Sequence, residues 1–356
     1  MNWWKKLKKN PLAQIGAVLL LIFYLTAIAA EFVAPYDPYV SQPDGSLLPP
    51  TQIYWRNQET GEFIGPHVYP TTQGAVDLET GDRLLKVNYQ EPSPLTLFVR
   101  GDEYKLWGLI PGDVHLFGTL GPAKFNLIGT DDQARDQFSR LVHGARISLF
   151  IGLVGITISF PLGTIVGGIS GYFGGVVDSI LMRLVEVLMT IPSIYLLVTL
   201  TLILPAGITS AQRFLLIVVI TSFVSWSGLA RVIRGQVLSI KQREFVQAAR
   251  SMGANPFYII VRHVLPQTAT YIIIAATLSV PGFIVAESVL SLIGLGIQQP
   301  DPSWGNMLSL STNASVLLLQ PWLVWPPALL IILTVLAFNL LGDGLRDALD
   351  PRSVQR

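Results

Sequence analysis

The chain has 356 residues, of which 51% are hydrophobic and only 13% are charged, and its formal net charge is +1. Soluble domains average about 25% charged residues, so this balance indicates a membrane protein, and the small net charge indicates neither a nucleic acid nor an acidic partner. The absence of cysteine excludes disulfides, thiolate metal sites and cysteine nucleophiles. The four histidines lie far apart and show no paired-ligand spacing, so we expect no metal site.

Six apolar runs are long enough to cross a bilayer, whose core of about 30 Å needs roughly 20 helical residues. They cover residues 12–33, 146–170, 180–204, 213–232, 268–292 and 322–342. The first run resembles a signal peptide, because four lysines precede it and Ala27-Ile28-Ala29 resembles a cleavage site. Its apolar stretch is longer than the roughly 7–15 residues of a signal core, which favours a retained helix.

The positions of lysine and arginine predict the orientation of these spans. Residues 1–10 hold four lysines and no acid, and residues 231–266 hold six basic residues against Glu244 alone. An even number of spans separates the two clusters, so both lie on one side, and the positive-inside rule makes that side cytoplasmic. Both termini are therefore expected in the cytoplasm, with residue 80 and the weakly charged region 296–321 outside.

Residues 37–128 differ from the rest of the chain and separate the first span (1–36) from a core of five spans (129–356). The region 34–128 carries eleven acidic and six basic residues with many prolines, glycines and threonines. Its segments LLKVNY and LTLFVR alternate in the manner of short strands, and ETGD at 79–82 is typical of a turn. We therefore expect a small β-rich extracytoplasmic insertion, and nothing in it resembles a catalytic constellation.

Small residues and prolines recur inside the spans. Gly163, Gly167 and Gly171 stand four residues apart, a spacing that allows two helix backbones to approach closely. Prolines that bend helices occur at positions 161, 192, 281, 326 and 327. Ordinary packing of membrane helices explains each of these positions taken alone. Taken together, the positions are typical of a bundle of bent helices that changes conformation.

A broken, partly polar segment, residues 244–266, lies between the fourth and fifth spans. Its first helix is expected to end at Gly253, a residue suited to the left-handed position after a helix. Asn255 can cap a second helix, Pro256 fits the first turn of that helix, and Pro266 is expected to stop it. The pattern predicts two short helices at an angle.

Ala248 and Ala249 are expected to expose a small-residue surface on the first of these helices. Such a surface suits docking of a cytoplasmic partner. An amphipathic elbow in the membrane interface, with arginines on phospholipid headgroups, fits the same residues equally well. The pattern alone leaves the two interpretations open.

The segment resembles the EAA loop of ABC-importer permeases, through Gln247-Ala248-Ala249, Gly253 and Leu265-Pro266. A glutamine stands at the position of the glutamate that names the motif. Four further stretches resemble the dipeptide/oligopeptide/nickel permease family, C-subunit type, with Gln133-Ala134 where the family usually has Leu-Gly. They are KKNPLAQIG at 8–16, GTDDQARDQFSRLVHGARISL at 129–149, MRLVEVLMTIPSIYLL at 182–197 and AESVLSLIGLGIQQPDPSWGNML at 286–308.

The resemblance covers about 1–36 and 126–356, and it implies an all-α polytopic membrane protein of the type I ABC-importer permease kind. The chain would be the permease subunit of an ATP-driven importer in the bacterial inner membrane, most consistent with di- and oligopeptide cargo. A second homologous permease, two cytoplasmic ATPases and an extracytoplasmic solute-binding protein would complete it. Coupling within the 242–266 element would fall to Glu244, Gln247, Ala248, Ala249, Gly253, Arg262 and Pro266.

The chain itself is not expected to be an enzyme. A phosphate-binding P-loop needs a Gly-Lys dipeptide, and the sequence contains none. ATP and magnesium would therefore be bound by the partner ATPases, and no cofactor is expected here. The alternative of an ATP-independent secondary transporter or channel would need ionisable residues clustered in the spans, which are few. A third possibility is a structural anchor that presents residues 34–128.

Two acidic residues lie in or near the spans. Glu186 stands one turn from Arg183, and a local ion pair explains it. Glu287 lies late in the fifth span with no basic residue near it in sequence, and an acid at membrane depth is a candidate functional residue. It could bind a peptide amine in transit or hydrogen-bond the following loop, and the sequence leaves both open.

Overall fold

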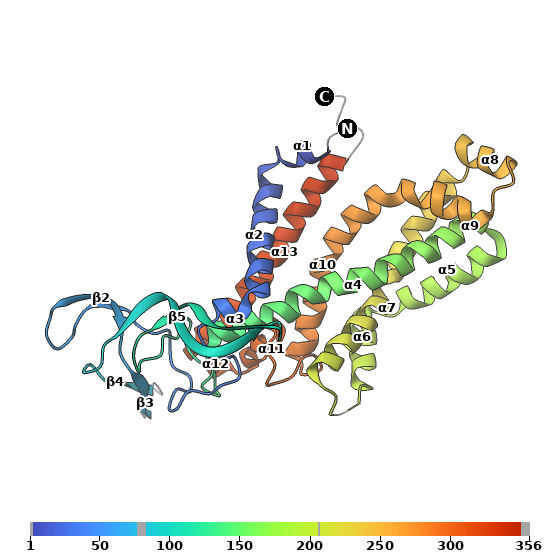
Figure 1. Cartoon of the computed structure of the whole chain (residues 1–356). Helices are drawn as coiled ribbons and strands as arrows, with labels where there is room; N and C mark the ends of the chain where they lie inside the picture. The colour runs from blue at the N-terminus through green and yellow to red at the C-terminus, as the bar shows by residue number, and fades with distance from the viewer. Residues whose placement is uncertain (1–2, 77–82, 206, 350–356) are drawn as a thin grey trace. The chain divides into compact units, whose positions relative to one another are not determined.

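The computed structural model describes residues 3–76, 83–205 and 207–349 (Figure 1). The chain divides into two compact units. The helical unit comprises Met1–Leu20, Phe150–Glu287 and Leu333–Arg356, and the insertion unit comprises Leu21–Leu149 and Ser288–Ile332.

Most of the chain is helical. The helices are α1 (Trp3–Leu7), α2 (Pro11–Ile28), α3 (Ala30–Val33), α4 (Gln137–Phe173), α5 (Gly175–Thr190), α6 (Ser193–Leu202), α7 (Ser210–Ile240), α8 (Glu244–Ser251), α9 (Pro256–Ile259), η1 (Ile260–Val264), η2 (Leu265–Thr268), α10 (Ala269–Leu292), α11 (Trp304–Leu308), η3 (Ser309–Thr312), α12 (Ala314–Leu319) and α13 (Pro321–Leu349).

Within the described residues, five helical segments are long and apolar enough to cross a membrane, and five of the six predicted spans fall on them. They are Pro11–Ile28, Gln137–Phe173, Ser210–Ile240, Pro256–Leu292 and Pro321–Leu349. The remaining prediction, 180–204, falls on α5 and α6, which meet at 85°. Ile191 adopts an extended backbone because the ring of Pro192 disfavours the helical conformation in the residue before it. This predicted span is therefore not a single straight helix but a bent pair, with the geometry of a broken span or of a re-entrant loop.

The predicted glycine stripe on α4 packs directly on the backbone of α7. A Cβ atom added at Gly163 would lie 2.8 Å from the carbonyl oxygen of Trp226, and one at Gly171 would lie 2.8 Å from that of Arg234. Gly167 meets the carbonyl of Ala230 in the same way. The three glycines thus face three carbonyls spaced four residues apart, which confirms the prediction that this spacing serves close backbone approach.

The β-rich insertion that the sequence predicts is present. Its strands are β1 (Tyr54–Arg56), β2 (Phe63–Val68), β3 (Thr71–Val76), β4 (Arg83–Val87), β5 (Ser93–Leu106) and β6 (Ile110–Thr119). They form an antiparallel sheet in the order β1-β2-β5-β6 and a separate β3-β4 pair. LLKVNY contributes to β4 and LTLFVR lies in β5, as expected, while the turn predicted at 79–82 lies outside the described residues.

A buried charged turn precedes α4 in the insertion unit. Asp131 forms a 2.6 Å ion pair with Arg135 and a 3.4 Å ion pair with Arg140, and all three side chains are almost fully buried. The Asp131 carboxylate also accepts hydrogen bonds from the backbone N–H groups of Gln133 and Arg135. Because buried charges are costly unless they are paired and hydrogen-bonded, this network fixes the turn tightly.

Ala134 in this turn has a φ of +61°, a left-handed conformation that disfavours a side chain. It is the position where the family usually carries glycine. We expect Ala134→Gly to raise the free energy of unfolding by about 0.5–1 kcal/mol. Glycine removes the backbone strain of the folded state, and this gain exceeds the cost of the larger conformational entropy that glycine gives the unfolded chain. Thermal unfolding of the detergent-purified chain measures the change, and an unchanged or lower midpoint would show that the strain at Ala134 does not exceed the entropic cost of glycine.

Candidate functional site

The segment between α7 and α10 is helical almost throughout and belongs wholly to the helical unit. It lies at one end of α4 and α7 (Figure 1). Helix α8 begins after Arg243 and is followed by a tight turn at Gly253 and by the short α9. The Asn255 carboxamide accepts a hydrogen bond from the N–H of Phe257 (2.9 Å), and Pro256 occupies the first turn, which confirms both predicted capping features.

One face of this segment is buried in the helical unit. Val246 and Ala249 of α8 pack in one apolar cluster with Ile233 and Val237 of α7. The same cluster includes Tyr172, Leu229, Ile240, Ile259, Ile260 and Val264. Apolar burial is the main stabilising term in such clusters, so α8, α9 and η1 are held against α7 as one packed body.

The prediction that Ala249 is exposed is wrong, because its side chain is only 3% exposed. On a short helix, two adjacent alanines point about 100° apart, so only one of them can share the outward face. Ala248 is that residue and is exposed. Of the two alanines, only Ala248 contributes a small side chain to the exposed surface of α8.

The outward face of the segment is unusually apolar for a stretch between spans. Met252 is 81% exposed, Val261 66%, Phe257 59% and Tyr258 56%. All of the predicted coupling residues except Ala249 are also exposed, namely Glu244, Gln247, Ala248, Gly253, Arg262 and Pro266. An exposed apolar patch with a polar rim is typical of a protein or membrane interaction site.

The prediction that Pro266 ends the second helix is wrong. The chain passes from α9 through a π-helical turn (η1) and a 3₁₀ turn (η2) into α10 without leaving a helical path. Proline lacks an N–H and its ring clashes with the preceding turn of a regular α-helix. The N–H of Leu265 bonds the carbonyl of Ile260, five residues back, and this wider turn accommodates the ring.

Polar contacts tie the start of the segment to its neighbours. The Lys241 ammonium donates to the carbonyl of Gly171 (2.7 Å) at the end of α4, and the Arg250 guanidinium lies 5.5 Å from the centre of the Tyr172 ring. The Gln247 amide donates to the carbonyl of Lys241 (2.9 Å), where α7 ends. An ionised glutamate has no proton to donate, so this contact depends on the glutamine at position 247.

Gly253 has a φ of +79°, as its predicted role requires, and open space surrounds it. We expect Gly253→Val to strain the turn by about 1–2 kcal/mol or more, because a β-branched residue is unfavourable in the left-handed region. Gly253→Asn should cost much less, because asparagine adopts this conformation more readily. Thermal unfolding of the two purified variants measures the difference, and equal midpoints would refute a backbone role for Gly253.

Glu287 in α10 is fully buried, with 0% of its surface exposed. The structure therefore does not bring it to a surface that cargo could touch in this conformation. The pair predicted for Glu186 is present, since the Arg183 guanidinium lies 3.1 Å from its carboxylate on an exposed face. Within the described residues, no group of three or more His, Cys, Asp or Glu side chains is placed to hold a metal ion.

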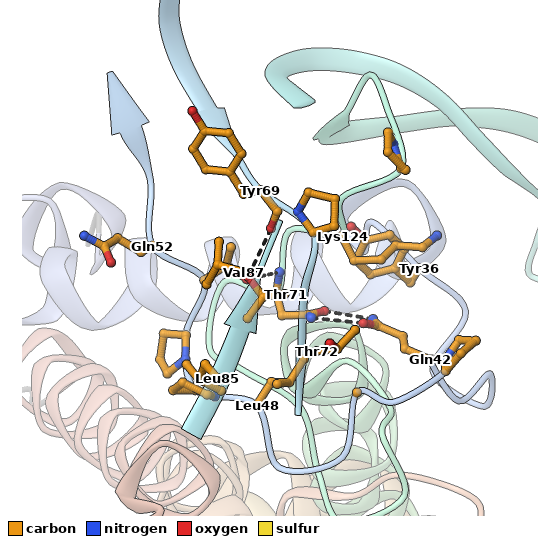
Figure 2. Close-up of a pocket in the computed structure, with 18 of the residues that line it drawn as sticks. Tyr36, Gln42, Leu48, Gln52, Tyr69, Thr71, Thr72, Leu85, Val87 and Lys124 are labelled. Carbon is orange, nitrogen blue, oxygen red and sulfur yellow. Dashed lines mark hydrogen bonds between the residues drawn. The ribbon is translucent and has the colours of Figure 1, made fainter. Parts of the chain in front are cut away.

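The insertion unit contains a cavity of about 470 Å³ beside β3 and β4. Figure 2 shows Tyr36, Tyr69, Leu85 and Gln42 around it. Gln42 exchanges two amide hydrogen bonds with Asn126, at 2.8 and 3.0 Å. Burial raises the pKa of Tyr36 above its ordinary value, so its phenol remains neutral. Phenols, amides and hydroxyls suit hydrogen bonding to a polar ligand, and no nucleophile–base pair is formed among them.

Comparison with known proteins decides the identity. The family model described as "Binding-protein-dependent transport system inner membrane component" matches residues 160–355, which is more than half of the chain. The model described as "N-terminal TM domain of oligopeptide transport permease C" matches residues 2–50. The chain belongs to this permease family.

Three relatives illustrate the permease's place in the family. It is 34% identical to the dipeptide transport system permease protein DppC of Bacillus subtilis, over 98% of this chain and 84% of the relative. It is 42% identical to the oligopeptide transport system permease protein OppC of Haemophilus influenzae, over 64% of this chain and 71% of the relative. It is 40% identical to the glutathione transport system permease protein GsiD of Pectobacterium atrosepticum, over 65% of this chain and 74% of the relative.

These matches confirm the resemblance stated from the sequence motifs. The chain is a multi-pass inner-membrane permease subunit of an ABC importer, similar to DppC and OppC. The permease's 244–266 segment lies within the region matched by the main family model. Both family models leave residues 51–159 unmatched, which include all six strands.

Sequence reasoning missed two groups of residues at this site. The first is the group of exposed apolar residues Met252, Phe257 and Tyr258. Their position within a charged segment is the feature of the sequence that could have indicated an apolar surface. The second is Lys241 and Arg250, which contribute only positive charge to the sequence pattern but make specific contacts with the end of α4. Only the fold reveals those contacts, since some 70 residues separate the partners in sequence.

Proposed function

We propose that the 244–266 segment of this permease is the docking element for a cytoplasmic ATPase. The observation that carries the proposal is its two-sided construction: one face is packed into the α7 cluster and the other presents exposed Ala248, Met252, Phe257 and Tyr258. A segment that served only to join two spans would need neither face. Glu244, Gln247 and Arg262 would form the polar rim of the docking surface.

The packed face provides a route for coupling. A displacement of α8 is resisted by Val246 and Ala249, which share a cluster with Ile233 and Val237 of α7. Lys241 and Arg250 add polar links to the end of α4. ATP binding would close the ATPase pair and move the docking element, which would shift the spans between inward- and outward-facing states. Such a switch requires two conformations that ATP stabilises differently.

The full importer would contain two related permease chains of the type I architecture, two ATPases that bind ATP and magnesium, and a solute-binding protein. Short peptides are the proposed cargo, because relatives similar over most of their length carry dipeptide and oligopeptide transport in their names. A glutathione permease among the relatives is consistent with the same class, since glutathione is a small peptide. The insertion, with its excess of acidic residues, would contact the solute-binding protein.

The experiment that tests this function is purification of the tagged permease in mild detergent from its native membrane. We expect a second permease chain and ATPase subunits in the purified complex, together with ATP hydrolysis that the solute-binding protein and peptide stimulate. Isolation of the chain alone, with ATP-independent peptide uptake in proteoliposomes, would instead support a secondary transporter or channel. Recovery of extracytoplasmic partners alone would support an anchor for the insertion.

The proposed orientation places α8 in the cytoplasm and the insertion outside, with both termini cytoplasmic. Residue 80, which is predicted to be extracytoplasmic, is not among the described residues. Exposed Gln90 therefore reports on the insertion, and exposed Gln242 reports on the cytoplasmic side. Because the chain has no cysteine, single cysteines at these positions report their own location. An impermeant thiol reagent should label Gln90→Cys in spheroplasts and Gln242→Cys only after permeabilisation. The reverse pattern would invert the orientation.

A further inference from the structure

The tip of the β5–β6 hairpin, residues 106–110, is an apolar turn with no role in the proposed coupling. It joins β5 to β6 where Leu106 pairs with Ile110, and Trp107 and Gly108 both have positive φ. Hairpin turns usually carry polar residues or glycine, asparagine and aspartate. Here Leu109 is 82% exposed, Ile110 63% and Trp107 51%. Hydration of these side chains is unfavourable, so the tip needs an apolar or interfacial environment.

The hairpin tip is held against the end of the first span. The Trp107 indole N–H donates to the carbonyl oxygen of Ile28 (2.9 Å), the last residue of α2. The Arg146 guanidinium lies 4.8 Å from the centre of the Trp107 ring and donates to the carbonyls of Ala27 (2.7 Å) and Ile28 (3.0 Å). Arg146 is itself ion-paired with Glu31. These contacts all lie within the insertion unit and fix the tip beside the final turn of α2.

The length of α2 locates that final turn relative to the bilayer. Its 18 residues rise by about 27 Å, at 1.5 Å per residue. This length is slightly less than a hydrocarbon core of about 30 Å, so a spanning α2 ends with Ile28 close to the core boundary. Ile22, Leu25 and Ile28 are 50%, 54% and 41% exposed on this span, as expected for side chains that contact lipid. The exposed tip, which Trp107 ties to Ile28, therefore lies beside the end of an exposed apolar helix, near the depth expected for the membrane interface.

A second apolar pair on the same hairpin extends this surface. Leu97 and Phe98 of β5 are 69% and 63% exposed, and the Phe98 ring lies 6.3 Å from that of Phe32 in α3. Helix α3 begins two residues after α2 ends, so this contact also lies close to the membrane boundary. Lys105 beside the tip is exposed and can extend toward lipid phosphates. Tryptophan flanked by aliphatic and basic residues is typical of membrane interfaces.

We propose that the β5–β6 hairpin tip inserts into the lipid interface at the end of α2 and anchors the insertion to the bilayer. Leu109 and Ile110 enter the boundary between headgroups and acyl chains, and Trp107 lies among the headgroups. Lipid is favoured over a protein partner because Trp107 ties the tip to the last residue of α2, a helix apolar enough to cross the membrane. The anchor restricts how far the hairpin moves from the end of α2.

The test uses the cysteine-free full chain with a single Leu109→Cys substitution, labelled with an environment-sensitive fluorophore and reconstituted in phosphatidylcholine/phosphatidylglycerol vesicles. Gln90→Cys in the turn before β5 is the matched control, because it is exposed and lies at the opposite end of that strand. We expect blue-shifted emission at position 109, with quenching by shallow nitroxide lipids at least twofold stronger than at position 90. Iodide in the aqueous phase should quench position 90 more strongly.

Two outcomes would overturn the proposal. Strong iodide quenching at position 109 without lipid quenching would place the tip in water. Protection from both quenchers would show that a protein surface covers the tip instead of lipid. Since Leu109 is 82% exposed within the chain, its replacement removes little packing, and the labelled chain should retain the unfolding midpoint of the unlabelled one.

Discussion

Ala248→Trp is expected to lower the affinity of the permease for its ATPase by roughly 5- to 150-fold. Ala248 is the exposed member of the alanine pair on α8, so tryptophan adds a large side chain at the proposed docking surface without entering the chain's own core. Overpacking of a close interface costs about 1–3 kcal/mol, and each 1.4 kcal/mol is a tenfold change in affinity. Retention of ATPase on the purified permease at increasing dilution measures the effect.

Ala248→Ser is the matched control, because serine keeps the side chain small and should preserve ATPase binding. Ala249→Trp is unsuitable as a test, since Ala249 is buried among Val246, Ile233 and Val237 and its replacement would disrupt the segment itself. If the outward face of α8 lay in the membrane interface, tryptophan at 248 would be accepted readily. Normal ATPase binding by Ala248→Trp would therefore favour the interfacial elbow.

Gly167→Val is expected to destabilise the helical unit by about 1–3 kcal/mol, the usual range for overpacking. A Cβ atom at Gly167 would lie 2.9 Å from the Cβ of Ile233 and would overlap the carbonyl oxygen of Ala230. Because the obstacle is backbone, the two helices must separate to admit the new side chain. This separation would also loosen the contacts that α4 makes with α7 at Gly163 and Gly171. Thermal unfolding of the purified chain in detergent measures this loss.

Gly235→Ala is the control for this substitution, because it lies on α7 and a Cβ added there meets nothing within 4 Å. Alanine is favoured over glycine inside a helix by about 1 kcal/mol, so this variant should be neutral or more stable. A drop in midpoint for Gly235→Ala comparable to that for Gly167→Val would mean that the glycines serve flexibility and not close packing.

Much of the fold was predictable because membrane helices are encoded by local properties. The apolar runs matched helical segments at five positions, and the four-residue glycine spacing correctly indicated close backbone contact. Pro192 correctly indicates a bend, but it does not predict that the run divides into two helices that meet at 85°. Hydropathy averaged over 20 residues does not distinguish a straight span from two shorter helices that meet at an angle.

The errors at the candidate site have related causes. Which of two adjacent alanines faces outward depends on how α8 rotates against α7, and that is set by Val246 packing with residues distant in sequence. Pro266 was expected to end a helix because regular α-helical geometry excludes it. A π-helical turn immediately before the proline removed that conflict. The contacts of Lys241 and Arg250 with the end of α4 likewise follow from the tertiary fold alone.

Site-directed cross-linking from position 248 tests the central claim most directly. The cysteine-free chain allows a single Ala248→Cys variant, which would be assembled with its partners and treated with a short thiol-to-amine cross-linker, with exposed Gln90→Cys as the control. The account predicts a covalent adduct between position 248 and an ATPase subunit, and no such adduct from position 90. If an assembled, ATP-hydrolysing complex gives no ATPase adduct from position 248, then α8 does not dock the ATPase and the proposed coupling route is wrong.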